Sequence, residues 1–295
     1  MASTIAKTVS ELLNEEKWTR ATLNNYTIQN FKDLDLIIEQ ARAEGLEVWA
    51  DQYPYEASAT GLVSALMPAW AQAGGREELR KRLSDSATRA KIRAEMAENL
   101  RRRAGAERIQ FRRYVPDPSI EGQTLARIAR DRNSDPVDVA LSLVETGSPA
   151  IVSFGMLEDD VRAFMTQPWT MTASDGDLVP MGEGVPHPRV YGTFARKIRR
   201  YVVDEAVVRL EDAIRTMTSL PAQVFRMKDR GVLRAGAFAD VVVFDLARVR
   251  DPATYDKPHQ LAEGMAHVIV NGTAAVADGA VTPERAGRVL RRDRQ

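Results

Sequence analysis

The strongest constraint on the fold is a strand–helix–strand pattern that ends in a carboxylate. Residues 150–155 and 169–174 are short apolar runs, and the segment between them starts with acidic residues at Glu158 and stops at Pro168. Acidic residues suit a helix N-terminus, and proline ends a helix. Asp175 and a glycine follow the second run directly. The pattern predicts a βαβ unit that delivers Asp175 to the C-terminal edge of a parallel sheet or barrel, where α/β proteins place functional groups.

A related pattern occurs earlier in the chain. Residues 34–44 carry apolar side chains at helical spacing, and Gly45 is a candidate for the helix C-cap. Residues 46–50 predict a strand that runs into a polar turn, in which Tyr53 and Tyr55 flank a proline. The two tyrosines either pack in an aromatic turn or face a ligand, and the pattern alone leaves both alternatives open.

The middle of the chain has a different character. Residues 74–147 are rich in charge, with apolar side chains at helical spacing, and Asp135-Pro136 has the residue types of a helix start. The basic run 101–103 raises the alternative of nucleic-acid binding. Acidic residues are mixed in, no aromatic residues are interleaved, and the net charge of the chain is +0. We therefore predict a solvated, mainly helical insertion and no nucleic-acid partner.

The C-terminal part changes to an alternating pattern of period two. Strand signals lie at 239–245 and 265–271, and Asn271-Gly272 is typical of a tight hairpin turn. Residues 223–285 therefore predict a small β module, and residues 286–295 a basic, frayed tail.

Composition excludes several classes of protein. The chain has 295 residues with 44% hydrophobic content, which is enough for a substantial core. It has no cysteine, no signal-peptide core and no apolar run of membrane-spanning length, so we expect a soluble, cytoplasmic protein without a membrane partner. Its only histidines are His187, His259 and His267, which is few for a metal site; the last two fall in the β module and are expected to be structural. Residues 1–33 have a helical pattern and stay unassigned.

Several motifs together point to one family. They are Asp51-x-Tyr53-Pro54-Tyr55-x-Ala57-Ser58, Ser174-Asp175-Gly176, His187-Pro188-Arg189-x-Tyr191-Gly192-Thr193-Phe194-x-Arg196, Met217-Thr218-Ser219-Leu220-Pro221-Ala222, and Gly236-x-x-Ala239-Asp240-Val241-Val242-Val243-Phe244-Asp245. In this order, between about residues 35 and 290, they resemble the D-aminoacylase (N-acyl-D-amino-acid deacylase) branch of the amidohydrolase superfamily. Residues 1–33 do not share the resemblance.

The resemblance implies an α/β fold. Residues 34–222 would form the C-terminal part of a (β/α)8-type metal-dependent hydrolase barrel, with 74–147 as its helical insertion, and residues 223–285 a β-sandwich module. It also implies a function, namely hydrolysis of the amide bond of N-acyl-D-amino acids by a water that zinc activates. A small-molecule N-acyl amino acid would be the ligand.

The resemblance also implies roles for single residues. Asp175 would shuttle the proton between the water and the leaving nitrogen, and Arg189 would grip the α-carboxylate of the substrate, with a structural ion pair as its alternative. One of Tyr53 and Tyr55, with Tyr55 favoured, would assist at that carboxylate. Met156 would line the side-chain pocket or pack in the core, and His187 would contact substrate or metal.

The metal ligands of the family have no counterpart here. The chain has no His-x-His and no cysteine, which leaves Asp175 as a candidate metal ligand without the other ligands. Two or three parallel strands also cannot close a barrel. We therefore expect that a second chain completes the barrel, that the N-terminal helices cover its open edge, or that the chain is a truncated product. A catalytically inactive fragment or binding module is the alternative function.

Overall fold

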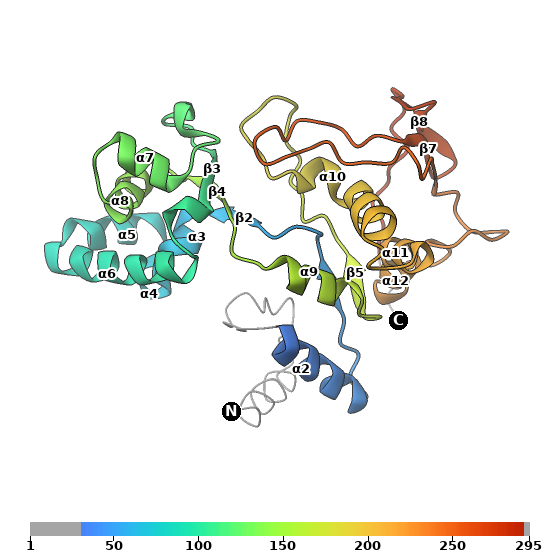
Figure 1. Cartoon of the computed structure of the whole chain (residues 1–295), viewed down its shortest axis with the longest axis horizontal. Coiled ribbons are helices and arrows are strands. Elements are labelled where there is room, and N and C mark those ends of the chain that lie inside the picture. The colour runs from blue at the N-terminus through green and yellow to red at the C-terminus, as the bar shows by residue number, and fades with distance from the viewer. Residues whose placement is uncertain (1–30, 292–295) are drawn as a thin grey trace.

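The structure is a computed structural model that describes residues 31–291. A helical lobe formed by residues 58–153 and a second lobe formed by residues 189–291 flank a central part (Figure 1). The N-terminal segment expected for residues 1–33 lies outside the described residues, except that 31–33 begin the first described helix. No helix among the described residues is long and apolar enough to cross a membrane.

The central part contains a parallel strand pair. The predicted helix at 34–44 is confirmed as α2 (Phe31–Ala43), and β1 (Ala50–Gln52) pairs in parallel with β5 (Thr170–Thr172). The strand expected at 46–50 therefore begins only at Ala50. The reason is local, because Arg42 donates a 2.7 Å hydrogen bond from Nη1 to the carbonyl of Val48 and stacks on Trp49. The carbonyl of Val48 is thus held by a side chain instead of a strand partner.

The helical lobe contains a strand trio that corrects the predicted βαβ unit. The apolar run at 150–155 does form a strand, β4 (Ala150–Ser153), but it pairs antiparallel with β2 (Ser58–Gly61) and β3 (Ile109–Arg113). Because β4 and β5 lie in different sheets, the βαβ prediction was wrong. A short apolar run bounded by turns fits a parallel or an antiparallel sheet, and its length does not distinguish the two.

Residues 109–113 form a strand inside the span that was predicted to be mainly helical. Ile109 and Phe111 are fully buried and alternate in the sequence with the polar residues Gln110 and Arg112, which is the spacing of a strand. The surrounding charge density hid that alternation in the sequence.

The remaining elements of this lobe are helical. They are α3 (Leu62–Leu66), α4 (Ala69–Gln72), α5 (Gly75–Ser84), α6 (Ser86–Arg102), η2 (Ala106–Arg108), η3 (Pro118–Ile120), α7 (Leu125–Asp131) and α8 (Pro136–Thr146). Those from α5 to α8 fit the mainly helical insertion predicted for residues 74–147. The predicted helix start is confirmed, because the Asp135 side chain accepts from the backbone N–H of Val137 at 2.9 Å. The lobe has its own apolar core, in which Leu66, Ile92 and Leu141 are fully buried.

The second lobe begins with helices. They are α10 (Arg189–Arg196), η4 (Lys197–Asp204, a π-helix), α11 (Leu210–Met217) and α12 (Ser219–Val224). A four-stranded antiparallel sheet follows, formed by β6 (Val241–Phe244), β7 (Met265–Val270), β8 (Thr273–Ala277) and β9 (Ala280–Val281). The predicted hairpin is confirmed, with φ of 50° at Asn271 and 84° at Gly272. Within residues 31–291 this module is one sheet, and the expected sandwich stays a prediction.

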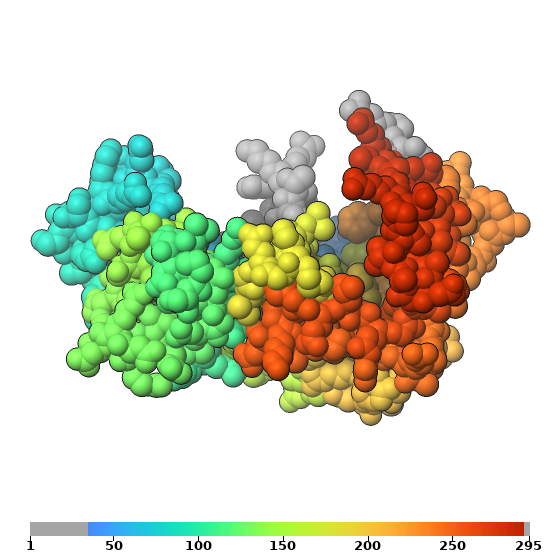
Figure 2. Space-filling view, turned by 90° about the horizontal axis from the view of Figure 1, so that it is seen from above, coloured from blue at the N-terminus to red at the C-terminus, as the bar shows by residue number. Residues whose placement is uncertain are grey.

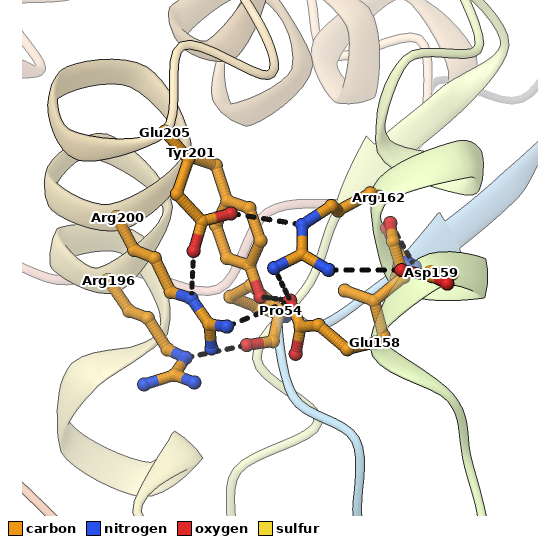
Figure 3. A network of polar contacts seen from close by, with 10 residues as sticks. Pro54, Glu158, Asp159, Arg162, Arg196, Arg200, Tyr201 and Glu205 are labelled. Atoms are coloured by element: carbon orange, nitrogen blue, oxygen red, sulfur yellow. Dashed lines mark hydrogen bonds and ion pairs between the residues drawn. The ribbon is translucent and has the colours of Figure 1, made fainter.

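A polar network joins the central part to the second lobe (Figure 3). It ties η4 to α9 (Glu158–Met165), the helix that leads into β5. The hydroxyl of Tyr201 donates to Glu158 at 2.6 Å, and Arg200 pairs with both Glu158 and Glu205. Arg162 reaches Glu205 from α9 at 3.0 Å. Because η4 continues α10 without a break, this network fixes β5 relative to the helix that starts at Arg189.

Candidate functional site

Arg189 is the centre of the candidate site. It is the first residue of α10, and only 5% of its side chain is exposed. The guanidinium lies over the ring of Tyr53 at 4.6 Å from the centroid, and Nη2 is 2.8 Å from a carboxylate oxygen of Asp175. Nη1 is buried without a hydrogen-bond partner among the described residues. A buried guanidinium donor without an acceptor is costly, so this position is suited to an incoming anion.

Asp175 and Tyr53 reach the site from the ends of the parallel pair. Gln52 of β1 is in register with Thr172 of β5, and the N–H of Ala173 continues the pairing to the carbonyl of Gln52 at 3.0 Å. Both side chains therefore leave the same C-terminal edge, which confirms the predicted placement of Asp175 just beyond a parallel strand. Asp175 has a φ of 47° and a 67% exposed side chain, so its carboxylate is open to solvent.

His187 does not take the expected position against substrate or metal. It is fully buried, its Nε2 lies 2.9 Å from the carbonyl of Ala57, and its Nδ1 accepts from the backbone N–H of Arg189 at 3.0 Å. Burial, assisted by the charges of Arg189 and Arg112, lowers the pKa of His187 to about 3. The imidazole is therefore neutral, and it links the backbone at the start of α10 to the backbone of Ala57.

Tyr55 is likewise a packing residue, contrary to the prediction that it contacts the ligand. Only 1% of it is exposed, and its hydroxyl donates to Asp251 at 3.0 Å. Arg196 covers its ring at 4.5 Å from the centroid. Tyr53 is the tyrosine that lies beside Arg189. Met156 is half-buried and lies between β4 and α9. That it lines a side-chain pocket stays a prediction.

A segment of the second lobe, residues 251–260, holds the site together, and the sequence did not reveal it. In Figures 1 and 2 this orange segment reaches across to α10 and the yellow loop that follows Asp175. Asp251 packs so closely on α10 that a Cβ added at Gly192 would lie 1.9 Å from its Oδ1. Burial raises the pKa of Asp251 despite its hydrogen bond with Tyr55. The one available signal was a glycine inside a helical run, which marks a close approach.

His259 in the same segment anchors the loop after Asp175. Its Nδ1 lies 2.9 Å from the hydroxyl of Tyr191 and 3.2 Å from the N–H of Gly182, and its Nε2 lies 2.9 Å from the carbonyl of Gly184. The structural role expected for this histidine fits these contacts, which join the segment to the site loop rather than to a strand.

Two arginines of strand β3, in the helical lobe, contact the loop that follows Asp175. Arg112 forms an ion pair with Asp177, and Arg113 forms one with Glu183. The carbonyl of Arg112 also accepts from the N–H of Val185 at 2.8 Å. The loop that carries Asp175 is thus attached to both lobes (Figure 2).

Lys197 lies buried behind β5 and was also missed. Only 3% of it is exposed, and its Nζ donates to the hydroxyls of Thr172 at 2.7 Å and Thr216 at 2.9 Å. Both contacts are to neutral groups, and burial lowers the pKa of Lys197 to about 8.

The described residues do not form a metal site. No group of three or more His, Cys, Asp or Glu side chains among residues 31–291 is arranged to hold a metal ion. His187 has both nitrogens engaged with backbone, and Asp175 faces a guanidinium. The residues present therefore do not fit a catalytic zinc, which needs about three protein ligands.

The fold is that of an amidohydrolase. Residues 10–276 match the sequence profile of the amidohydrolase family, so the chain belongs to that family. The match begins within the N-terminal segment for which the sequence showed no resemblance.

The relatives are deacylases of N-acyl-D-amino acids. An N-acyl-D-glutamate deacylase of Alcaligenes xylosoxydans xylosoxydans is 37% identical over 256 residues, which are 87% of this chain and 44% of the relative. A D-aminoacylase of the same organism is 41% identical over 177 residues, which are 60% of this chain and 35% of that relative.

Solved structures of D-aminoacylases and of a related deacylase also match this chain. A D-aminoacylase crystal structure gives a TM-score of 0.69 at 33% identity, covering 89% of this chain and 46% of that one. The N-acyl-D-glutamate deacylase of Bordetella bronchiseptica, complexed with zinc and a phosphonate inhibitor, gives a TM-score of 0.67 at 33% identity. That match covers 90% of this chain and 47% of the Bordetella chain. The predicted resemblance to the D-aminoacylase branch is confirmed, and the chain spans about half the length of these structures.

Proposed function

We propose that this chain supplies the carboxylate-binding and proton-transferring part of an N-acyl-D-amino-acid deacylase, which hydrolyses the amide bond of N-acyl-D-amino acids. The observation that carries the proposal is Arg189. It is buried, it is held by an aromatic ring, one of its nitrogens lacks an acceptor among the described residues, and the other contacts an exposed carboxylate that a ligand can replace.

Arg189 would bind the α-carboxylate of the ligand. A carboxylate that bridges Nη1 and Nη2 gives the unpartnered donor an acceptor and displaces Asp175 from Nη2. Two parallel charge-assisted hydrogen bonds also fix the orientation of the ligand. The ring of Tyr53 beneath the guanidinium keeps its plane in place. Asp175, once released, is an exposed carboxylate next to the ligand that can accept a proton and return it to the leaving nitrogen.

Hydrolysis further requires groups that residues 31–291 do not provide. We propose that β1 and β5 belong to a (β/α)8-type barrel, and that the sheet β6–β9 is one layer of a sandwich, both completed by polypeptide outside the described residues. The zinc ligands would come from the same source. That a second chain supplies this polypeptide remains a prediction.

A binding module without catalysis is the second candidate. It is favoured by the lack of a metal-binding group among the described residues and by the occupation of Arg189 by Asp175. Both candidates require Arg189 to bind carboxylate, and only the first requires Asp175 to carry a proton.

Arg189→Met is expected to weaken the binding of N-acetyl-D-leucine by at least about tenfold, because charge-assisted hydrogen bonds to a buried guanidinium are lost. Titration calorimetry on the 295-residue chain measures the effect. Arg113→Met removes an exposed arginine of strand β3 and should leave the affinity unchanged. Equal binding by Arg189→Met and the unmodified chain would contradict the proposed carboxylate site.

The chain alone is expected to release no D-glutamate from N-acetyl-D-glutamate in zinc-containing buffer, because the described residues lack the metal-binding groups. Adding a separately produced N-terminal half of the Alcaligenes N-acyl-D-glutamate deacylase should restore release. In that mixture Asp175→Asn should lower the rate by about a hundredfold or more, since a general acid–base group is lost. Ligand binding should not weaken, because the carboxylate that competes for Arg189 is removed. Full activity of Asp175→Asn would refute the proton role, and no restored activity would favour the binding module.

A further inference from the structure

A polar cavity lies between η4 and the turn that follows β6, in the second lobe. Its volume is about 460 Å³, which is within the range of small-molecule sites. Arginine side chains line it from both sides, because Arg199 belongs to η4 while Arg248 and Arg250 belong to the turn. The other lining residues are Ala247, Val249 and Glu263. Three guanidinium groups and one carboxylate therefore give the cavity an excess of positive charge.

The backbone of this turn is fixed by its own hydrogen bonds. The carbonyl of Asp245 accepts from the N–H groups of Arg248 at 3.0 Å and Val249 at 2.8 Å. The side chain of Asp245 accepts from the N–H of Ala247 at 2.9 Å. Gly264 packs against the turn so closely that an added Cβ would lie 2.4 Å from the nitrogen of Val249. These N–H groups are engaged, so the turn offers a ligand its side chains and not its backbone donors.

The three arginines differ in how they are paired. Arg199 forms a forked ion pair with Asp204, with contacts of 2.6 Å and 3.1 Å. Arg250 contacts one carboxylate oxygen of Glu263 through both Nε and Nη2, each at 2.6 Å. The exposed side chain of Arg248 has no hydrogen bond or ion pair among the described residues. Arg248 is therefore the guanidinium of this cavity that is free to bind an anion.

The lining also indicates the chemistry of the ligand. An unpaired guanidinium beside two partly neutralised ones favours an oxyanion, and the planar fork of an arginine matches the oxygens of a phosphate group. None of the residues that line the described cavity is aromatic, so it offers no ring on which a nucleobase could stack. The cavity therefore suits a small phosphate-type anion without an aromatic ring.

We propose that this cavity binds a small phosphate-type anion, either a pyrophosphate or a phosphomonoester, with Arg248 as its main contact. The anion joins two segments that lead to the candidate site. On one side, η4 continues the helix that begins at Arg189. On the other, Arg250 directly precedes Asp251, which packs on that helix. The inference does not depend on the proposed function, because no residue that lines the cavity belongs to the candidate site.

Calorimetric titration of the 295-residue chain with pyrophosphate and with glycerol phosphate, at an ionic strength of about 0.15 M, tests the proposal. At least one of the two anions should bind, and the tighter one identifies the kind of phosphate group. Arg248→Met should weaken that binding by at least about tenfold, because charge-assisted hydrogen bonds are lost. Glu263→Gln should strengthen it by about threefold, because the carboxylate that repels the anion and occupies Arg250 is removed.

Arg285→Met is the matched control. Arg285 is an exposed arginine of the same lobe that lies outside the cavity, and its side chain also lacks a partner among the described residues. The affinity of this variant should be unchanged, and equal losses in Arg285→Met and Arg248→Met would overturn the inference, since the anion would then bind surface charge in general. Binding of neither anion would overturn it as well. So would a loss in Arg189→Met that Arg248→Met does not share, which would place the anion at the candidate site and leave the proposed function standing.

Discussion

Lys197→Met is expected to raise the free energy of unfolding by about 3 kcal/mol at pH 7. The lysine is 3% exposed and contacts the neutral hydroxyls of Thr172 and Thr216 through its ammonium group. Burial lowers its pKa from 10.5 to about 8, and a pKa difference of one corresponds to about 1.4 kcal/mol. Methionine fills a similar volume without a charge. The two hydroxyls remain satisfied, because they lie 3.0 Å from each other.

The lowered pKa of Lys197 also predicts a pH dependence with a defined sign. The folded protein disfavours the charged lysine, so its destabilising effect is fully present below about pH 8, the folded pKa. The effect fades as the pH rises toward 10.5, because the unfolded chain then also loses the proton. The stability of the unmodified protein should therefore rise through this window relative to Lys197→Met.

Urea unfolding of both proteins between about pH 7 and pH 10.5 measures the difference. Arg199→Met is the matched control, since Arg199 lies two residues along the same helix with a 37% exposed side chain. It should change the free energy of unfolding by at most about 1 kcal/mol at every pH. A Lys197→Met protein that is less stable than the original at pH 7 would show that the ammonium group is needed where it lies.

Gly192→Ala is expected to lower the free energy of unfolding by about 3 kcal/mol and to loosen the candidate site. The new methyl group would lie 1.9 Å from Oδ1 of Asp251, so the segment 251–260 must move away from α10. That movement breaks the hydrogen bond from Tyr55 and leaves its buried hydroxyl without a partner. Overpacking and an unsatisfied polar group each cost about 1 to 3 kcal/mol.

Gly61→Ala provides the control, because Gly61 has a φ of −83° and an added Cβ would be 3.8 Å from the nearest atom, Oγ of Ser64. Its free energy of unfolding should stay within about 1 kcal/mol of the original. Thermal unfolding and calorimetric binding of N-acetyl-D-glutamine measure both effects of Gly192→Ala. Unchanged stability in that variant would mean that the contact between α10 and Asp251 is not made in solution.

Local signals predicted the elements whose causes are local. The N-cap at Asp135, the hairpin at Asn271-Gly272 and the position of Asp175 after a strand all depend on residues within a few positions. Pairing of strands was not predictable in this way. The apolar run at 150–153 has the same character in a parallel or an antiparallel sheet, and its partner β3 was hidden among charged residues.

The sequence by itself singled out Asp175 and Arg189 as candidate site residues, because their residue types, order and flanking motifs resemble those of the family. Only the tertiary structure decided which aromatic side chain serves them. Tyr53 and Tyr55 are equivalent in the sequence, but one lies beneath Arg189 and the other donates to Asp251, 196 residues away. It likewise assigned His187 to backbone support, buried Lys197 against neutral hydroxyls, and brought Arg112 to the loop. These facts arise from contacts between distant segments, which depend on how the lobes pack and not on any local pattern.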